Sequence, residues 1–373
     1  MIDVVIAGAG PAGTLLATEL RRSGLDVALL ERRTAATAGS RAIGLHPPAL
    51  RALEACGASE RILARAARVA AGVAVCRGRV IGRVRFDRPG ARYGFIATVP
   101  QAVTEEALRA CAPEPRRGIE VIRVRDDGQG VVVAYREGGV EGEMRARAAV
   151  IATGSDRALA GITAAERPLT DRYVMADLDS APLHPPHTAV LTLDRAGVVE
   201  SFPLPGGARR LVAWHDGSGD PAERLRRAVS VRMGDDALAG RIERASEFGI
   251  RRVLLRRLRR GRVFVIGDAA HEISPIGGQG MNLGLLDAAT LAPALAHWLR
   301  EPTDLRPVDR WERDRLASAR TAANLAGMNT AIGRARGAAG HAAAMAAVRA
   351  AAATPLARLA AHAYGMGLDR SVS

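Results

Sequence analysis

The chain of 373 residues is 48% hydrophobic and 25% charged, which is ordinary for a globular protein with a sizeable core. Its net charge is +14, and all 53 basic residues are arginine. Because the arginines are spread along an alanine-rich sequence, we interpret them as coding bias and expect no nucleic-acid partner. No apolar run approaches the roughly 18 residues of a membrane span, so no transmembrane segment is expected.

The three cysteines, Cys56, Cys76 and Cys111, cannot all pair with one another and follow no metal-ligand spacing. We therefore predict a cytoplasmic protein with no disulfide framework and no bound metal. We also expect no secretory signal, because the first predicted strand begins at residue 2.

The first 31 residues predict a strand, a helix and a second strand. The run IDVVIA is apolar and β-branched, TLLATELRRS is an amphipathic run ended by Gly24, and LDVALLE is again strand-like. Such a βαβ unit is the usual start of a parallel sheet.

The turn GAGPAG between the first strand and the helix contains G-x-G-x-x-G. Gly8 allows the tight turn, Gly10 lets the backbone approach a pyrophosphate, and Gly13 allows the helix to pack closely on the strand. With Pro11 and Ala12, these residues begin a helix whose positive end would bind phosphates. The turn therefore predicts an adenine dinucleotide but does not distinguish NAD from FAD.

An acidic residue, Glu31, ends the second predicted strand, where its carboxylate would accept the ribose hydroxyls of the dinucleotide. A carboxylate there would repel the 2′-phosphate of NADP, although Arg32 and Arg33 next to it could offset that repulsion. The choice between nucleotides stays open at this point.

The middle of the chain predicts further strands and helices, and then an insertion. Prolines interrupt alternating runs such as HTAVLTLD and RRLVAWH between about residues 166 and 250, which indicates a separate antiparallel sheet. The buried strand pattern resumes with RVFVIGD, and the chain is helical from about Asp287 onward. Before the insertion we expect helices at 49–57 and 99–112, short strands within 69–95, a meander over 119–139 and a buried strand within 144–154.

A second glycine-rich stretch, GDAAHEISPIGGQGMNLG, follows the strand RVFVI. With this stretch the chain resembles the FAD-dependent monooxygenases of the aromatic hydroxylase type, which have the para-hydroxybenzoate hydroxylase fold and include ubiquinone-ring hydroxylases. The GAGPAG turn with Glu31, the segment SRAIGLHPPALRALEACG, Gln101 in VPQAVTEEAL and the P-x-x-G-G-Q-G-x-N pattern carry the resemblance, which covers most of the chain.

The resemblance implies an α/β fold: a Rossmann-like FAD-binding domain, an inserted, mainly antiparallel substrate sheet, and C-terminal helices. We expect the FAD-binding domain at 1–70, 98–165 and 257–320, the substrate sheet at 71–97 and 166–256, and a helical segment at 321–373.

The second motif can also be explained physically as a flavin site. Gly267 and Asp268 end a strand, and the Asp268 carboxylate can accept hydrogen bonds from ribityl hydroxyls. The glycines that follow leave room for a flat isoalloxazine ring, and the N–H groups at the start of the next helix would face flavin N1 and the C2 carbonyl. The residues expected to do this are Gly277, Gly278, Gly280, Met281 and Asn282, with Pro275 bordering the ring.

Two further residues are weighed on the resemblance. Arg41 matches a family arginine near the cofactor and the incoming nicotinamide, and it is the sole catalytic candidate; other catalytic residues stay unknown. His271 invites a general-base interpretation, but the resemblance favours a place in the cofactor loop. A third family motif, Asp-Gly followed by Ser and Arg, is altered here to Asp156-Arg157, with Ala160 where serine is plausible.

The resemblance implies a monooxygenase: NADH or NADPH reduces the flavin, O2 adds at C4a, and the hydroperoxide transfers one oxygen to an aromatic or polyketide-like small molecule. Phe202 and Trp214, with Pro203 and His215 nearby, are the candidate substrate contacts from the sheet. Alternatives are a dehydrogenase, oxidase or prenyl-chain reductase of the same fold, and a scaffold without catalysis. We expect a monomer or homodimer.

Overall fold

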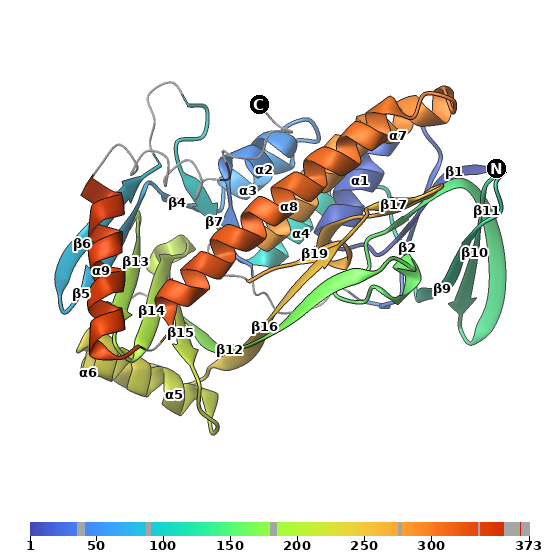
Figure 1. The fold of residues 1–373 in the computed structure, drawn as a ribbon. Coiled ribbons are helices and arrows are strands. Elements are labelled where there is room, and N and C mark those ends of the chain that lie inside the picture. The colour runs from blue at the N-terminus through green and yellow to red at the C-terminus, as the bar shows by residue number, and fades with distance from the viewer. Residues whose placement is uncertain are drawn as a thin grey trace.

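The computed structural model describes residues 1–35, 42–86, 91–179, 185–274, 278–334, 336–353 and 366. Arg41, Pro275 and Gly277, all predicted near the cofactor, lie outside the described residues. Figure 1 shows one large sheet at each end of the molecule, with the long helix α8 (Arg306–Gly333) running from one end toward the other.

The first sheet contains the predicted parallel βαβ unit. Its strand order is β17-β18-β11-β1-β2-β8, with β10 and β9 continuing from β11 as an antiparallel meander. The apolar strand β1 is central and pairs in parallel with β2 and β11, as expected for a strand buried on both faces. The strands are β1 (Ile2–Ala7), β2 (Val27–Glu31), β8 (Arg116–Arg117), β9 (Ile119–Asp126), β10 (Val131–Glu137), β11 (Val140–Ile151), β17 (Arg259–Arg260) and β18 (Val263–Val265).

Strand β11 differs from the prediction, which separated the meander from a buried strand within 144–154. One continuous strand of 12 residues serves both purposes. Its first part is antiparallel to β10, and its apolar last part is parallel to β1 and β18. The alternating exposure of its first half and the complete burial of its end explain why the sequence looked like two elements.

The second sheet is mainly antiparallel, with the order β19-β16-β12-β15-β14-β13-β5-β6. Its strands are β5 (Ala71–Cys76), β6 (Arg79–Arg85), β12 (Ala164–Leu178), β13 (Thr188–Asp194), β14 (Gly197–Pro203), β15 (Arg209–His215), β16 (Ser246–Leu255) and β19 (His271–Glu272). A small third sheet contains β3 (Gly44–Leu45), β4 (Ala67–Val69) and β7 (Ile96–Thr98).

Helices cover both sheets. Helices α1 and α7 pack on each other, and α1 also packs on β1 and β2. Helix α9 packs along β6, at the left of Figure 1. No helix within the described residues is both long and apolar enough to cross a membrane. The remaining helices and short helical turns are α1 (Pro11–Arg22), α2 (Pro47–Ala52), α3 (Ala58–Leu63), α4 (Gln101–Arg109), η1 (Ala158–Ala160), η2 (Pro205–Gly207), α5 (Pro221–Ala228), η3 (Val229–Met233), α6 (Asp236–Gly240), η4 (Gly267–Ala269), α7 (Gln279–Arg300) and α9 (Ala338–Ala353).

This architecture confirms the predicted fold class. The long strands β12 and β16 pair with each other and connect the inserted sheet to the nucleotide-binding half, and separate apolar clusters form the two halves of the core. The domain boundaries remain a prediction.

Candidate functional site

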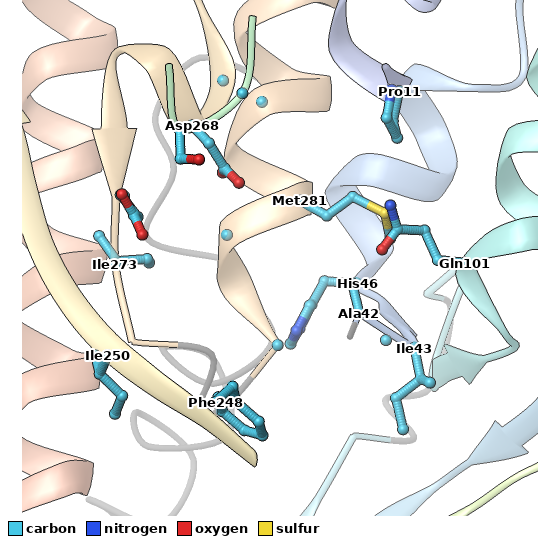
Figure 2. Close-up of a pocket in the computed structure, with 18 of the residues that line it drawn as sticks. Pro11, Ala42, Ile43, His46, Gln101, Phe248, Ile250, Asp268, Ile273 and Met281 are labelled. Carbon is cyan, nitrogen blue, oxygen red and sulfur yellow. The ribbon is translucent and has the colours of Figure 1, made fainter. Parts of the chain in front are cut away.

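A cavity of about 1340 Å³ lies between the two large sheets. Residues from the turn after β1, the end of β2, η4 and the start of α7 line one part, and residues from β13 to β16, α8 and α9 line the other. Figure 2 shows Asp268, Met281 and Gln101 in one region of the cavity and Phe248 and Ile250 of β16 in another. The two glycine motifs, far apart in the sequence, therefore border one cavity that also reaches the inserted sheet.

In the first glycine turn Gly8 and Gly13 have the predicted structural roles, and the predicted pyrophosphate contact of Gly10 stays a prediction. Gly8 has φ +108°, and a Cβ there would lie 2.4 Å from the Ala152 carbonyl oxygen. A Cβ at Gly13 would lie 2.0 Å from the Gly8 carbonyl oxygen, so α1 packs directly on the turn. Gly10 lines the cavity, and a Cβ there would meet no protein atom within 4 Å. The protein itself requires Gly8 and Gly13, whereas the bare side of Gly10 faces open cavity, with Pro11 and Ala12 in the lining beside it.

Glu31 is buried at the end of β2 and also lines the cavity. Its Oε2 accepts a hydrogen bond from the Ala9 N–H at 3.0 Å, and its Oε1 accepts from the backbone N–H and Nε of Arg33 at 3.0 and 2.9 Å. Burial alone would raise the pKa of Glu31, but the hydrogen bonds from Arg33 and Ala9 outweigh it and lower the pKa. Arg33 therefore keeps this carboxylate ionised, whereas Arg32 contacts Asp156 at 3.2 Å and both line the cavity.

Asp268, in the turn η4, directs an accessible carboxyl into the cavity. Among the described residues its side chain has no hydrogen bond or ion pair. Its accessible surface faces the cavity, and the cavity walls enclose it. Burial, with repulsion from Glu272 and Asp287, raises its pKa despite the opposing charges of His271 and Arg157. This carboxyl is therefore available to a ligand in the cavity.

Helix α7 begins within the second glycine motif, as predicted, but the side chain of Asn282 has a structural role. Gly278 caps the helix with φ +67° and lines the cavity. The Asn282 side chain accepts a hydrogen bond from the His46 N–H at 2.8 Å and donates to the carbonyls of Gly44 and Gly278 at 2.8 and 2.7 Å. It is fully buried and lies outside the cavity lining, so it fastens the helix start to the segment before α2.

Gly280 and Met281, in the first turn of α7, do line the cavity. Figure 2 shows the Met281 side chain pointing toward Gln101, the first residue of α4. The Gln101 amide donates a hydrogen bond to Glu105 at 2.9 Å. Met281 of α7 and Gln101 of α4 thus lie close together in the cavity wall, and Gly280 lines the same cavity.

Behind the second motif lies a buried charge network that the sequence analysis missed. Asp287 accepts hydrogen bonds from the Gly267 N–H at 3.0 Å and Arg315 Nε at 2.7 Å, and lies 2.6 Å from His271 Nε2. Burial alone would raise the pKa of Asp287, but His271 and Arg315 lower it to about 2. The same pairing outweighs burial and raises the pKa of His271. His271 lies outside the lining of this cavity and pairs with Asp287, so the structure favours this ion pair over the general-base role that the sequence analysis set aside. The sequence signal for the network was an aspartate inside the apolar run LGLLDAATLA.

A second missed residue is Gly284, about one turn before Asp287 on α7. A Cβ there would lie 3.0 Å from Gly267 Cα and 3.4 Å from Ala12 Cβ. A glycine inside a helix costs stability, so its position in MNLGLLDA could have indicated close packing. It lets α7 approach both glycine motifs at once.

The altered third motif forms two ion pairs. Asp156 faces Arg32, and Arg157 Nη2 contacts Glu272 Oε2 at 2.7 Å. Glu272 also contacts Arg251 Nε at 3.2 Å and lines the cavity. Arginine in place of glycine therefore ties this turn to strand β19.

On the sheet side, the structure brings Phe202 to the cavity but not Trp214. The Trp214 indole N–H donates to Asp171 Oδ1 at 2.9 Å, and its ring packs in the core. The prediction for Trp214 is therefore corrected: other core residues cover it. His215 and Pro203 also lie outside the lining.

Two curated relatives illustrate what the chain is similar to. It is 32% identical to a rifampicin monooxygenase of Streptomyces venezuelae, over 79% of this chain and 64% of the relative. It is 30% identical to a 6-methylpretetramide 4-monooxygenase of Streptomyces rimosus, over 88% of this chain and 63% of the relative. The chain thus spans slightly less than two thirds of the length of these relatives.

Solved structures share the fold. The p-nitrophenol 4-monooxygenase PnpA of Pseudomonas putida DLL-E4 superposes with a TM-score of 0.88 at 23% identity, over 99% of both chains. The OxyS anhydrotetracycline hydroxylase of Streptomyces rimosus has a TM-score of 0.80 at 27% identity, over 97% of this chain and 75% of the other. A family model described as an FAD binding domain matches residues 1–326. The chain therefore belongs to the FAD binding domain family.

Proposed function

We propose that this protein is an FAD-dependent monooxygenase that transfers one oxygen atom from O2 to an aromatic or polyketide-like small molecule, with NADH or NADPH as reductant. One observation carries the proposal: a single cavity joins the dinucleotide turn, the second glycine motif and the apolar face of the inserted sheet. Such a cavity can hold an extended cofactor with a substrate against its reactive end.

The residues around the cavity fit FAD. Gly10 leaves an open cradle at the start of α1, where the helix end favours a pyrophosphate. Glu31 is an ionised, buried acceptor beside it, placed for ribose hydroxyls. Asp268, whose carboxyl has no partner within the described part of the chain, faces the same cavity and suits a hydroxyl-bearing sugar chain. We propose that these three residues hold the two sugars and the pyrophosphate.

The start of α7 would hold the flavin ring. Gly278 and Gly280 present backbone without side chains at the cavity wall, so a flat ring can lie against them. The positive end of this 22-residue helix favours negative charge on the ring. When bound and reduced, FAD supplies the activation of O2 and the transfer of one oxygen atom.

The sheet side would hold the substrate and keep water out. Leu191, Val212, Phe248 and Ile250 give this part of the cavity an apolar wall, and Phe202 adds an aromatic face. An apolar, water-poor site protects reactive intermediates. The names of the relatives, which include rifampicin and 6-methylpretetramide, support a large ring system as the substrate class.

The alternative of a dehydrogenase, oxidase or prenyl-chain reductase is not favoured, because the relatives are named monooxygenases. The predicted cytosolic location and the predicted monomer or homodimer remain proposals. The small-molecule substrate class is also part of the proposal.

The proposal is tested with purified protein reconstituted with FAD. Polycyclic phenols would be screened for stimulation of NADH and NADPH oxidation, and the products of positive compounds analysed by mass spectrometry under 18O2. Incorporation of one 18O atom per product molecule is the expected result. Protein that binds FAD but only releases hydrogen peroxide or a desaturated product with every compound would contradict the proposal.

A further inference from the structure

We propose that Glu200 is the residue that selects the substrate, by accepting a hydrogen bond from a phenolic or enolic hydroxyl on an otherwise apolar ring system. This inference rests on the proposed function, which it deepens by naming the chemical class of the substrate. Glu200 belongs to none of the sequence motifs, and the proposal depends on its position in the inserted sheet.

Glu200 lies in the middle of strand β14, on the face that lines the cavity. Side chains on a strand alternate between faces, and Val198, Glu200 and Phe202 all line the cavity. The cross-strand neighbours of Glu200 are Leu191 on β13 and Val212 on β15, and both line the cavity as well. The carboxyl of Glu200 thus lies among apolar side chains of the cavity wall, and Arg210, two residues from Val212 on β15, lines the same cavity.

The Glu200 carboxyl is buried without a partner among the residues that the structure describes. The residue is 3% exposed, yet among the described residues its side chain makes no hydrogen bond and no ion pair. Arg210 is the cationic residue nearest to Glu200 in the sheet register. Its guanidinium instead forms an ion pair with Asp177, to which its Nε and Nη2 donate hydrogen bonds of 2.6 and 2.8 Å. Burial, with the negative charges of Glu200 and Asp171, raises the pKa of Tyr173 on β12. A buried polar group without a partner is costly, so this position makes sense when a ligand supplies the partner.

Burial raises the pKa of Glu200 to about 7. A carboxylate in such surroundings is a stronger hydrogen-bond acceptor and base than one in water. The desolvated carboxylate therefore favours a ligand that donates a hydrogen bond, and it rejects an isosteric ligand that cannot donate, because the charge would then stay unpaired. Hydroxylated aromatic rings and enols are the ligands of this cavity's shape that meet the requirement.

The test uses the oxidised FAD holoenzyme and a pair of probes, 1-naphthol and 1-methoxynaphthalene, with dissociation constants measured from the change in flavin absorbance. In the wild type, naphthol should bind about ten-fold more tightly than its methyl ether or better, as expected for a hydrogen bond to a charged group. In Glu200→Leu the ratio should fall to about one, while FAD binding is kept. Glu200→Gln, whose amide oxygen accepts without a charge, should keep part of the preference.

A matched control and a pH profile separate this role from a structural one. Glu247→Gln removes a carboxylate of the same sheet that does not line the cavity, and it should leave the ratio unchanged. The preference for naphthol should grow from pH 6 to pH 8 in the wild type, as the carboxylate forms, and should be flat in Glu200→Gln. Equal ratios in the wild type and Glu200→Leu, or no binding of either probe, would overturn the inference. Failure of the proposed function would instead appear as absent 18O incorporation, which these binding measurements do not use.

Discussion

Among individual residues, Asp287 connects the cofactor motif to the rest of the protein. Its carboxylate lies among the Gly267 N–H, His271 and Arg315, and both Asp287 and Arg315 are completely buried. Removing one partner of a buried ion pair leaves the other charge without compensation. The network therefore fixes where the strand end before Asp268 lies, although none of its charged side chains needs to touch FAD.

Asp287→Asn is expected to lower the free energy of unfolding by about 3–5 kcal/mol, because Arg315 and His271 lose their buried counter-ion. Chemical denaturation followed by circular dichroism measures this. Asp26→Asn removes an exposed partner of Arg21, 3.7 Å away, and should change the same quantity by about 1 kcal/mol or less. Similar effects of the two substitutions would show that the network does not stabilise the fold.

Glu200 should make stability depend on pH. Its pKa rises from the usual 4.5 to about 7 in the folded protein, so the folded state holds the proton more tightly than the unfolded state. The free energy of unfolding therefore decreases as the pH rises from about 4.5 to about 7, and it levels off above that range. The difference corresponds to about 3 kcal/mol.

Glu200→Leu and Glu200→Gln should therefore gain stability over the wild type, and the gain should be larger at pH 8 than at pH 5. Unfolding midpoints of the apoprotein in urea at both pH values measure this. A carboxyl with a structural role would give the opposite result, with both variants less stable at pH 8. A cavity that is more stable without its charge would be a case of function maintained at the expense of stability.

At the scale of elements, the turn between β1 and α1 contains one glycine that packing requires, Gly13, and one that we propose contacts the pyrophosphate, Gly10. A Cβ at Gly13 would overlap the Gly8 carbonyl oxygen, whereas a Cβ at Gly10 would meet nothing within 4 Å. Gly10 has φ −74° and ψ 179°, which alanine adopts without strain. The two positions therefore allow the protein's need for glycine to be separated from the ligand's need.

Gly10→Ala is expected to leave the stability of the apoprotein within about 0.5 kcal/mol of the wild type and to weaken FAD binding by about ten-fold or more, since a methyl group would enter the pyrophosphate space. Gly13→Ala should lower both the affinity for FAD and the stability of the apoprotein, with a loss of about 1–3 kcal/mol of stability. Fluorescence titration with FAD and thermal unfolding give the two quantities. If Gly10→Ala bound FAD as the wild type does, the pyrophosphate would have to lie elsewhere.

At the scale of the whole molecule, the sequence predicted what depends on local backbone. Both glycine motifs and Glu31 were recognised because tight turns, helix starts and strand ends leave short patterns. Asp287 and Arg315 were missed because they meet only after α7 and α8 pack together. Phe202 and Trp214 looked equivalent in their strands, and only the surrounding tertiary packing decides that one borders the cavity and the other does not.

The long-range charge of the molecule should act on the reductant. With a net charge of +14, the protein attracts anionic nucleotides, and salt screens that attraction. We expect the second-order rate constant for flavin reduction, measured anaerobically by stopped flow, to fall several-fold between about 0.05 and 0.5 M NaCl, and to fall more steeply with NADPH than with NADH, because NADPH carries an additional phosphate. The uncharged reductant 1-benzyl-1,4-dihydronicotinamide is the control and should show little dependence on salt. Equal dependence for all three reductants would mean that salt acts on the flavin site itself, and that the arginine-rich surface does not guide the nucleotide.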